Sequence, residues 1–318
     1  MNNNPRRKSD ILLKSAFEEA FPDLLRFFYP EADQVFDLDK EFQVLDKELR
    51  EIFPEREKKG GARAADLLVK VCLLKGGFEY ILVHVEIEGG NKPGFEKRMF
   101  QYQYRLTDRF GIPVEALAVF TGERNQRRPG QYHEKLIFTE ILFKYKAYQI
   151  FDHTHEELLG MDNPFSLIIL AAQKALLEGK IPEEELGEER LTIARTLIES
   201  GKYNHEKIAR FIIFLKNLVY IKDPKINRIF DIEVDTLMGR SNVMGIIETI
   251  NELNREEGFE MGLEKGIEKG LSQKELEKNI EFTKNLLSST DLSVSKIAGL
   301  VGVTEDFVRE ISNSLKDK

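Results

Sequence analysis

The stretch from Ala65 to Glu88 constrains the fold of this chain more than any other part of the sequence. Two runs rich in leucine, valine and isoleucine are separated by a short segment around Gly76. Strand-forming runs joined across glycines predict a β-hairpin. A three-residue loop centred on Gly76 places Leu67 opposite Val85, Val69 opposite Val83 and Val71 opposite Ile81. The hairpin therefore has one continuous apolar face, which must pack against another layer.

The same register gathers acidic residues on the other face, because side chains alternate across a strand. Asp66 faces Glu86, and His84 and Glu88 lie beside that pair. Like charges directly opposite each other destabilise a sheet, so they need protons, solvent or a cation. A hard divalent cation such as Mg²⁺ suits carboxylate ligands best. Two alternatives stay open: the acids are ordinary solvated ends of an amphipathic hairpin, or a two-residue loop shifts Asp66 opposite Ile87.

The composition limits the class of protein. With 318 residues, of which 42% are hydrophobic and 32% charged, the chain is long enough for one large domain or two smaller ones. A single cysteine, Cys72, excludes a disulfide framework and a cysteine-rich zinc site. The first residues carry no apolar segment behind their charges, and no run of about 18 apolar residues occurs. We therefore expect a cytoplasmic protein that does not enter a membrane.

Charge and motifs narrow the function further. The net charge of −8 argues against a general nucleic-acid coat, although Lys and Arg outnumber acids locally between Gly122 and Lys146. The chain has no G-x-S-x-G elbow, no phosphate-binding G-x-x-x-x-G-K-[ST] loop, no H-E-x-x-H pair and no Rossmann glycine fingerprint. A self-contained P-loop ATPase is therefore excluded.

The hairpin and its flanks resemble a known family. Arg63, Asp66, Glu86 and the run Arg98-Met99-Phe100-Gln101-Tyr102 resemble the PD-(D/E)XK phosphodiesterases. The resemblance is greatest to the Rpn family of recombination-promoting nucleases and transposase-like proteins. It implies an α/β fold with a restriction-endonuclease-like mixed sheet flanked by helices. It also implies a DNA endonuclease that uses Mg²⁺, or Mn²⁺ or Ca²⁺ in its place, and acts in recombination, mobile-element biology or defence.

The resemblance also implies roles for individual residues. Asp66 and Glu86 correspond to the metal-binding carboxylates, together with the backbone carbonyl of Ile87. Glu48 is the candidate for a further acid before the hairpin, with an ordinary solvated glutamate as the alternative. The sequence departs from the family pattern at Glu88, which stands where lysine is usual. A glutamate cannot stabilise developing negative charge, although it could accept a proton or bind a second metal ion.

The segment from Phe95 to Phe110 is predicted to form a helix after the turn-forming residues that precede it. Four of its residues recur at three- and four-residue steps and are expected on one face: Arg98, Gln101, Tyr102 and Arg105. By resemblance the candidate DNA contacts are Arg98, Gln101, Tyr102 and Arg63. Arg98 could hold a phosphate or pair with a carboxylate of the site. The alternatives are that Tyr102 belongs to the core and Arg105 to the surface.

The order of the other elements predicts a mixed sheet. A helix is expected from Ser9 to about Tyr29 with a break at Pro22. Residues 113–121 form a nearly continuous apolar run, expected as a buried strand parallel to the second strand of the hairpin. Residues 136–143 and 147–151 are expected as further strands. We assign 1–160 to the nuclease-like core.

The rest of the chain is predicted to be helical. Residues 161–256 have helical apolar periodicity and are expected as an accessory region. Glycines recur every four residues in 257–285, which fits a helical linker or a self-association helix. Residues 286–318 carry Ala298, Gly302 and Val308 at the spacing of a helix-turn-helix. Whether this module binds DNA stays open, because acidic residues begin its second helix.

These observations leave two hypotheses from different classes. In the first, the chain is a metal-dependent DNA endonuclease whose carboxylate cluster cleaves phosphodiester bonds. In the second, it is a catalytically degenerate member of the same fold that binds DNA or other copies of itself, through its helical region or its glycine-spaced tail. Both require the same fold. They differ in whether the carboxylate cluster catalyses cleavage of DNA.

Overall fold

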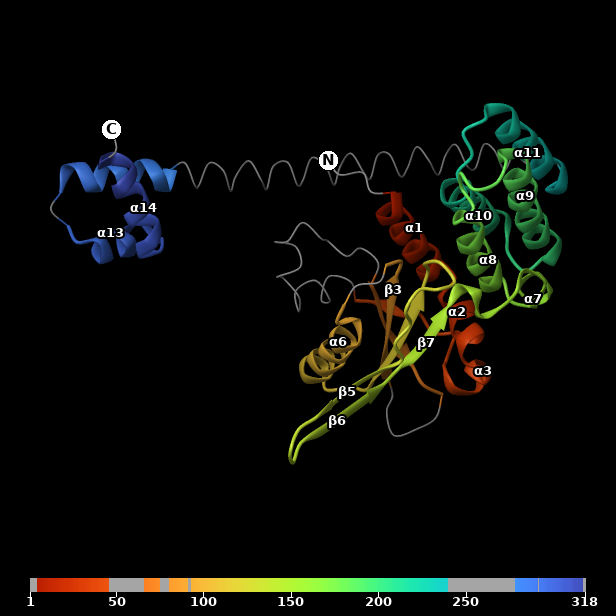
Figure 1. The fold of residues 1–318 in the computed structure, drawn as a ribbon, viewed down its shortest axis with the longest axis horizontal. Coiled ribbons are helices and arrows are strands. Elements are labelled where there is room, and N and C mark those ends of the chain that lie inside the picture. The colour runs from red at the N-terminus through yellow and green to blue at the C-terminus, as the bar shows by residue number, and fades with distance from the viewer. Residues whose placement is uncertain are drawn as a thin grey trace. The chain divides into compact units, whose positions relative to one another are not determined.

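The computed structural model describes residues 5–45, 66–74, 80–90, 93–239, 278–290 and 292–316 (Figure 1). The chain forms two compact units, Met1–Ile247 and Glu248–Lys318. The nuclease-like core and the helical accessory region, which the sequence suggested as separate regions, thus belong to one unit. No helix in the described ranges combines the length and the apolar character that crossing a membrane requires.

A five-stranded mixed sheet forms the centre of the first unit. Its spatial order is β1 (Gln43–Val44), β2 (Asp66–Cys72), β3 (Tyr80–Glu88), β4 (Val114–Phe120) and β7 (Lys146–Gln149). Antiparallel pairing joins β1 to β2 and β2 to β3, whereas β3, β4 and β7 run parallel. Helix α6 (Phe95–Phe110) makes the crossover from β3 to β4, as parallel neighbours require. The prediction of an α/β mixed sheet is confirmed.

The hairpin has the register expected from a three-residue loop. Leu67 lies opposite Val85, and Asp66 lies opposite Glu86. The alternative register, with Asp66 opposite Ile87, is excluded. The loop itself, residues 75–79, falls outside the described part of the chain.

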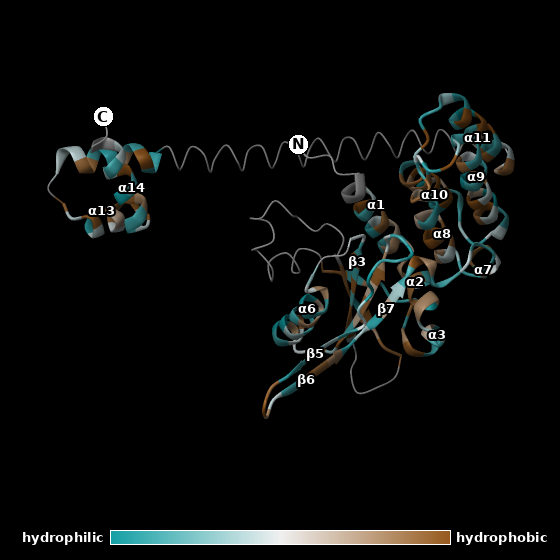
Figure 2. Cartoon of the chain, in the orientation of Figure 1, coloured by the Kyte–Doolittle hydropathy of each residue, from teal (hydrophilic) through white to brown (hydrophobic). Residues whose placement is uncertain are grey.

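Both faces of the sheet are covered, which explains why β3 is buried along most of its length. One face packs against α1 (Pro5–Glu19), which contacts β2 and β3. The other face packs against α6 in a cluster of buried residues that includes Leu82, Met99 and Leu106. The hydropathy colouring shows the apolar side of α6 turned toward the strands (Figure 2).

Helices make up most of the remainder of this unit. They are α2 (Phe21–Phe28), α3 (Ala32–Val35), the 3-10 helix η1 (Ile150–Asp152), α7 (His155–Gly160), α8 (Phe165–Ala175), α9 (Glu183–Ser200), α10 (His205–Leu218) and α11 (Pro224–Leu237). The N-terminal helix starts at Pro5 rather than at Ser9, and the break falls at Ala20. Pro22 follows in the first turn of α2, where its missing N–H costs no hydrogen bond.

A two-stranded ribbon, β5 (Gln131–Lys135) and β6 (Glu140–Lys144), leaves the body of the unit (Figure 1). The expected strand over residues 136–143 is therefore partly wrong, because the chain reverses direction at residues 136–139. The expected strand at 147–151 is present as β7, but it ends at Gln149, and residues 150–152 form η1 instead. The first part of the apolar run 136–143 is the exposed tip of the ribbon, and only its second part belongs to a strand.

The second unit is a small helical one. Its described part has a helix over residues 278–289, α13 (Val294–Val301) and α14 (Glu305–Lys316). Ile297, Ala298 and Val308 are buried together, and Gly302 ends α13 with a φ of 75°. A positive φ favours glycine, which explains that residue in the turn. The predicted glycine-spaced linker lies largely outside the described residues.

Buried tyrosines lead to a prediction about alkaline stability. Burial raises the pKa of Tyr29, Tyr145, Tyr148 and Tyr203 above its ordinary value, and the hydroxyl of Tyr203 also donates to Oδ2 of Asp23 at 2.6 Å. In the unfolded chain these groups ionise near pH 10. Their stabilising contribution is fully present below about pH 10 and is lost as the pH rises through the folded pKa values.

We therefore expect the free energy of unfolding in urea to decrease above about pH 10. Absorbance at the tyrosinate band should show these four tyrosines ionising only as the protein unfolds. The Tyr203→Phe variant should be less sensitive to alkali. Complete tyrosine ionisation in the folded protein near pH 10 would contradict this prediction.

A candidate active site at the carboxyl end of strand β3

A row of polar side chains lies on the α6 side of β3. His84, Glu86 and Glu88 occupy alternate positions of the strand and are 1%, 1% and 3% exposed. Carboxylates buried to this extent are expensive unless charged or polar partners surround them. Glu86 and Glu88 are therefore not solvated ends of an amphipathic hairpin, and their partners decide what the row can do.

Arg98 of α6 is the main partner of the two glutamates. One guanidinium nitrogen, Nη2, donates to Oε1 of Glu86 at 3.0 Å and to Oε2 of Glu88 at 2.8 Å. The guanidinium also lies over the ring of Phe95, 4.8 Å from its centroid. Burial acts to lower the pKa of Arg98, but the two glutamates outweigh it and the pKa is raised. Of the two roles considered for Arg98, pairing with carboxylates is the one present.

His84 extends the row away from Arg98. Its Nε2 lies 3.9 Å from Oε2 of Glu86, and its ring packs on that of Tyr102 with 4.4 Å between centroids. Tyr102 is 0% exposed, so the expectation that it contacts DNA is corrected: it is a core residue. Arg98 and Tyr102 face the sheet, whereas Gln101 and Arg105 are exposed. The sequence spacing had predicted that these four residues share one face of α6. In the structure two of them face the sheet and two face the solvent.

The loops that follow β3 and β4 are held by amide side chains. Oε1 of Glu88 accepts from the backbone N–H of Gly90 at 2.9 Å. Nε2 of Gln126 donates to the carbonyls of Glu88 and Gly90 at 2.7 and 2.9 Å, while its Oε1 accepts from the N–H of Gly122 at 2.7 Å. Gln149 donates to the carbonyl of Glu123 at 2.9 Å. These bonds fix the backbone around Glu88.

Asp10 of α1 reaches the same end of β3 from the opposite face of the sheet. A Cβ placed on Gly89 would lie 3.3 Å from both Oδ1 of Asp10 and Oγ1 of Thr121. These residues line a cavity of about 440 Å³ beside the ends of β3 and β4, to which Lys180 also contributes. The site therefore has acidic groups on both faces of the sheet edge.

Sequence reasoning missed Asp10, Gln126 and Gln149. The only signal for Asp10 was its place in the first turns of the N-terminal helix, which gives no hint of the strand it meets. The glutamines bond to backbone atoms that are distant in sequence, so no local pattern marks them.

The other expected site residues divide into three groups. Asp66 lies in β2 opposite Glu86, but its side chain is outside the described ones. Glu48 and Arg63 lie outside the described residues altogether. Ile87 is 4% exposed in the middle of the sheet, where it pairs with Val119 of β4.

The chemistry of the row suits a hard divalent cation in part. Within the described ranges no three His, Cys, Asp or Glu side chains lie close enough to bind one. Glu86 and Glu88 nevertheless offer carboxylate oxygens, and with Arg98 they leave one negative charge in excess. Asp66, whose backbone pairs with Glu86, adds a third carboxylate-bearing residue at this end of the hairpin. Oxygen ligands and excess negative charge are what Mg²⁺ requires.

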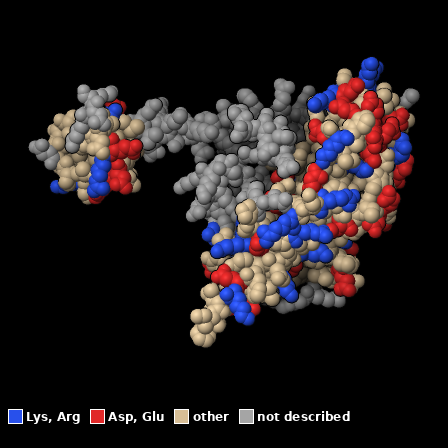
Figure 3. All heavy atoms as spheres, viewed as in Figure 1, with Lys and Arg blue, Asp and Glu red and all other residues tan. Residues whose placement is uncertain are grey.

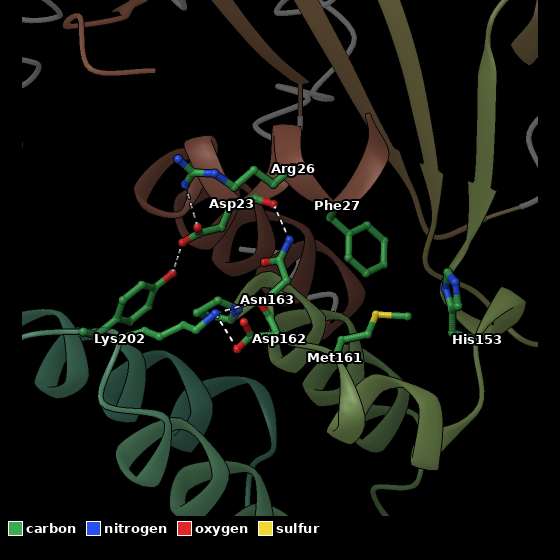
Figure 4. A pocket seen from close by; sticks show the side chains of 10 residues that line it. Asp23, Arg26, Phe27, His153, Met161, Asp162, Asn163 and Lys202 are labelled. Atoms are coloured by element: carbon green, nitrogen blue, oxygen red, sulfur yellow. Dashed lines mark hydrogen bonds and ion pairs between the residues drawn. The ribbon is translucent and has the colours of Figure 1, made fainter. Parts of the chain in front are cut away.

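A second cavity, of about 620 Å³, lies between α2 and the segment that joins α7 to α8 (Figure 4). Its polar groups pair with one another. Tyr203 and Arg26 bond to Asp23, and Lys202 pairs with Asp162 at 2.6 Å. Because these charges already neutralise each other, the end of β3 is the better candidate for chemistry.

We compared the chain with protein-family models, with curated proteins and with solved structures, and nothing matched in any of the three comparisons. The function is therefore argued from the site. Its distinguishing feature is a pair of buried glutamates on one strand, bridged by one guanidinium nitrogen.

Replacing Arg98 tests how strongly the row depends on its cation. Arg98→Met leaves two buried glutamates without their shared partner, so we expect a loss of about 3–5 kcal/mol in the free energy of unfolding. Lys97→Met, an exposed lysine on the same helix, is the matched control and should change stability little. Adding Glu86→Gln and Glu88→Gln to Arg98→Met should recover part of the loss. Wild-type stability of Arg98→Met in urea unfolding would contradict the bridge.

Gly122→Ala tests the amide bonds that hold the loops. An added Cβ would lie 2.6 Å from Oε1 of Gln126 and 3.1 Å from the carbonyl oxygen of Gly89, so Gln126 must move and lose hydrogen bonds. We expect a cost of about 1–3 kcal/mol in thermal or urea unfolding. Gly160→Ala is the control, because its Cβ meets nothing within 4 Å. Equal stability of the two variants would show that the Gln126 bonds contribute little.

Proposed function

We propose that this protein is a divalent-cation-dependent DNA endonuclease with a PD-(D/E)XK-type core. The observation that carries the proposal is the register of the hairpin. Asp66 lies opposite Glu86 at the end of β3, with Glu88 two residues further on the same face. Carboxylates gathered in this way suit a metal ion that acts on a phosphodiester.

The order of elements supports the proposal as well. A helical N-terminal segment is followed by an antiparallel hairpin, a crossover helix and a parallel strand. This order is compatible with the restriction-endonuclease-like core that the sequence resemblance implies. The candidate site lies at the carboxyl end of β3, beside the ends of two other parallel strands. Ligands of α/β sheets commonly bind at this edge.

Asp66 and Glu86 would hold the metal ion, Mg²⁺ by preference, with the carbonyl of Ile87 and with Glu48 as further candidates. When bound, such an ion offsets phosphate charge and supplies an activated water. The chain's own residues orient the carboxylates. Arg98 holds Glu86 from the side of α6, and the N–H of Gly90 holds Glu88.

Arg98 also supplies a positive charge at the position where the sequence lacks the lysine that is usual in the family. Glu88 stands where a lysine is usual, and Nη2 of Arg98 lies 2.8 Å from its Oε2. A positive charge is thus present beside this position, supplied by the next helix instead of by the strand. Arginine stays charged at any pH at which the protein folds, so this contribution does not titrate in the physiological range.

One observation favours the second hypothesis, a member that binds DNA or itself without cleaving. Arg98 already neutralises one of the two glutamate charges, and both glutamates are almost fully buried. In this alternative the row is a structural element, and self-association would use the helical region or the glycine-spaced tail. Substitution of the carboxylates would then leave function intact.

The C-terminal unit fits either hypothesis as a helix-turn-helix-like module. Glu305 and Asp306 begin α14, and both pair with Arg309, at 3.0 and 3.3 Å. These acids do not favour contact with phosphate at the start of that helix. The proposal as a whole assigns the protein to the cytoplasm and to a role in recombination, mobile-element biology or defence.

Plasmid nicking tests the proposal. We expect the full chain to nick supercoiled DNA with Mg²⁺ or Mn²⁺, and EDTA to abolish the nicking. Asp66→Asn and Glu86→Gln keep side-chain size and should each reduce the rate at least about 100-fold. Glu199→Gln removes an exposed carboxylate on α9 and should nick at the wild-type rate.

Each variant is first compared with the wild type by circular dichroism and thermal unfolding, so that a folding defect is not counted as lost catalysis. Equal nicking by wild type and both carboxylate variants would refute the proposed function. Absence of nicking together with retained DNA binding by all proteins would support the non-cleaving alternative.

A further inference from the structure

The tip of the β5–β6 ribbon exposes three consecutive apolar side chains. Leu136, Ile137 and Phe138 are 64%, 87% and 99% exposed, the highest values among the large hydrophobic residues that the structure describes. The ribbon extends away from the sheet, and its tip is the brown end of that projection in Figure 2. A single exposed leucine is ordinary, but a contiguous apolar tip on a projection indicates a binding surface.

The stem holds this tip in place. The strands pair continuously from Gln131 opposite Lys144 to Lys135 opposite Glu140. The N–H of Leu136 donates to the carbonyl of Thr139 at 2.8 Å and closes the turn. Because the turn is hydrogen-bonded, the apolar side chains are presented by a defined backbone and not by a loose loop.

The root of the ribbon is fastened to α6. Tyr132 is buried and stacks on Phe100 with 5.1 Å between ring centroids, and Phe143 lies 6.1 Å from the same ring. Since α6 also carries Arg98, the helix that orients the acidic row is the one that supports the ribbon. The ribbon and the candidate site are therefore both attached to α6.

The elements beside the root carry a local excess of cations, although the chain as a whole is acidic. On α6 and β7 the exposed cations Lys97, Arg105, Arg109 and Lys146 outnumber one exposed anion, Asp108. On the ribbon itself Lys135 and Lys144 are balanced by Glu134 and Glu140, and Lys135 pairs with Glu140 at 3.3 Å. Blue side chains gather over the middle of this face, above the tan projection (Figure 3). A local excess of positive charge on a protein of net charge −8 favours a polyanionic partner.

We propose that the β5–β6 ribbon is a wedge for duplex DNA. The ribbon enters a groove, Ile137 and Phe138 press against the base pairs and unstack them, and the cations of α6 and the ribbon stem contact phosphates. Two-stranded ribbons bind in the grooves of duplex DNA, and apolar side chains kink the DNA when they enter between base steps from the minor groove. The inference rests on the proposed function for its substrate, and it adds how that substrate is gripped and deformed.

Two other partners fit the observations less well. A flat membrane that meets the tip would face Glu134, Lys135 and Glu140 directly behind it, whereas most cations lie farther away along α6 and the base of the ribbon, where a duplex lying along the ribbon could contact them. A second copy of the chain would have to offer the basic face an acidic surface as well as an apolar cleft. Both partners are outcomes of the test.

The test uses the full chain and a short duplex that contains 2-aminopurine. Binding is measured with Ca²⁺, and cleavage of the same duplex is followed in parallel with Mg²⁺ or Mn²⁺. We expect wild-type protein to bind with a salt-dependent affinity and to raise 2-aminopurine fluorescence through unstacking. The double variant Ile137→Ser and Phe138→Ser should lose the fluorescence rise and bind about tenfold more weakly. Both residues are exposed, so thermal stability should not change.

The matched control is Ile229→Ser with Ile232→Ser, two exposed residues of α11 that are 58% and 55% exposed. This variant should behave as the wild type. A tip variant with wild-type affinity and fluorescence would overturn the wedge, as would a wild-type protein that does not bind the duplex. Loss of binding to phosphatidylserine vesicles, or a change of molar mass in light scattering, without a change in DNA binding would overturn it in favour of a membrane or a second copy.

The wedge and the proposed cleavage can fail separately. Nicking that is normal in the tip variant, with unchanged binding, removes the wedge and keeps the nuclease. A tip-dependent fluorescence rise without any nicking keeps the wedge and removes the nuclease.

Discussion

The shared contact of Arg98 with Glu86 and Glu88 is the interaction on which much of the first unit depends. Two carboxylates on alternate positions of a central strand could not stay buried without a cation between them. Because that cation comes from α6, the helix must dock with one particular rotation and at one height along β3. The same docking buries Tyr102 over His84 and turns Gln101 and Arg105 to solvent. The electrostatic requirement and the apolar packing of α6 therefore select the same position for the helix.

The carboxyl edge of the parallel strands is the second constraint. Three strands end there, and Gln126 and Gln149 tie the loops that leave them to one another through backbone carbonyls. A site built on strand ends and braced by such bonds keeps its geometry better than one carried by free loops. Asp10 joins this edge from α1, so both layers of helices contribute to it. The end of β3 thus combines acidic side chains, hydrogen-bonded loops and an adjacent cavity.

Charge is distributed unevenly over the first unit, and this bears on how an acidic protein could act on a polyanion. The buried row of β3 is acidic, whereas the outer surface of α6 is basic, with Lys97, Arg105 and Arg109 exposed against Asp108. A chain with a net charge of −8 would repel DNA over most of its surface. Local cations on the elements nearest the row would orient DNA toward it. The ribbon and the row, both fixed to α6, give this orientation a structural basis.

The sequence by itself favoured one register of the hairpin, which the structure selected over a two-residue loop, and it determined the limits of α6. The alternation of apolar residues has a period of two, so only one register buries a whole face, and Asp66 then falls opposite Glu86. Glycines at 94 and 111, with φ of 72° and 65°, bound α6 and mark both its ends.

Only the tertiary structure decided which side chains meet. Helical spacing grouped Arg98 with Arg105, but the plane of contact with the sheet separates them. Residues 136–138 have the hydrophobicity of a buried strand, yet they are exposed because no layer of the described unit covers them. The local sequence pattern shows which faces of an element are apolar. Packing between segments that are distant in the sequence determines which of those faces become buried.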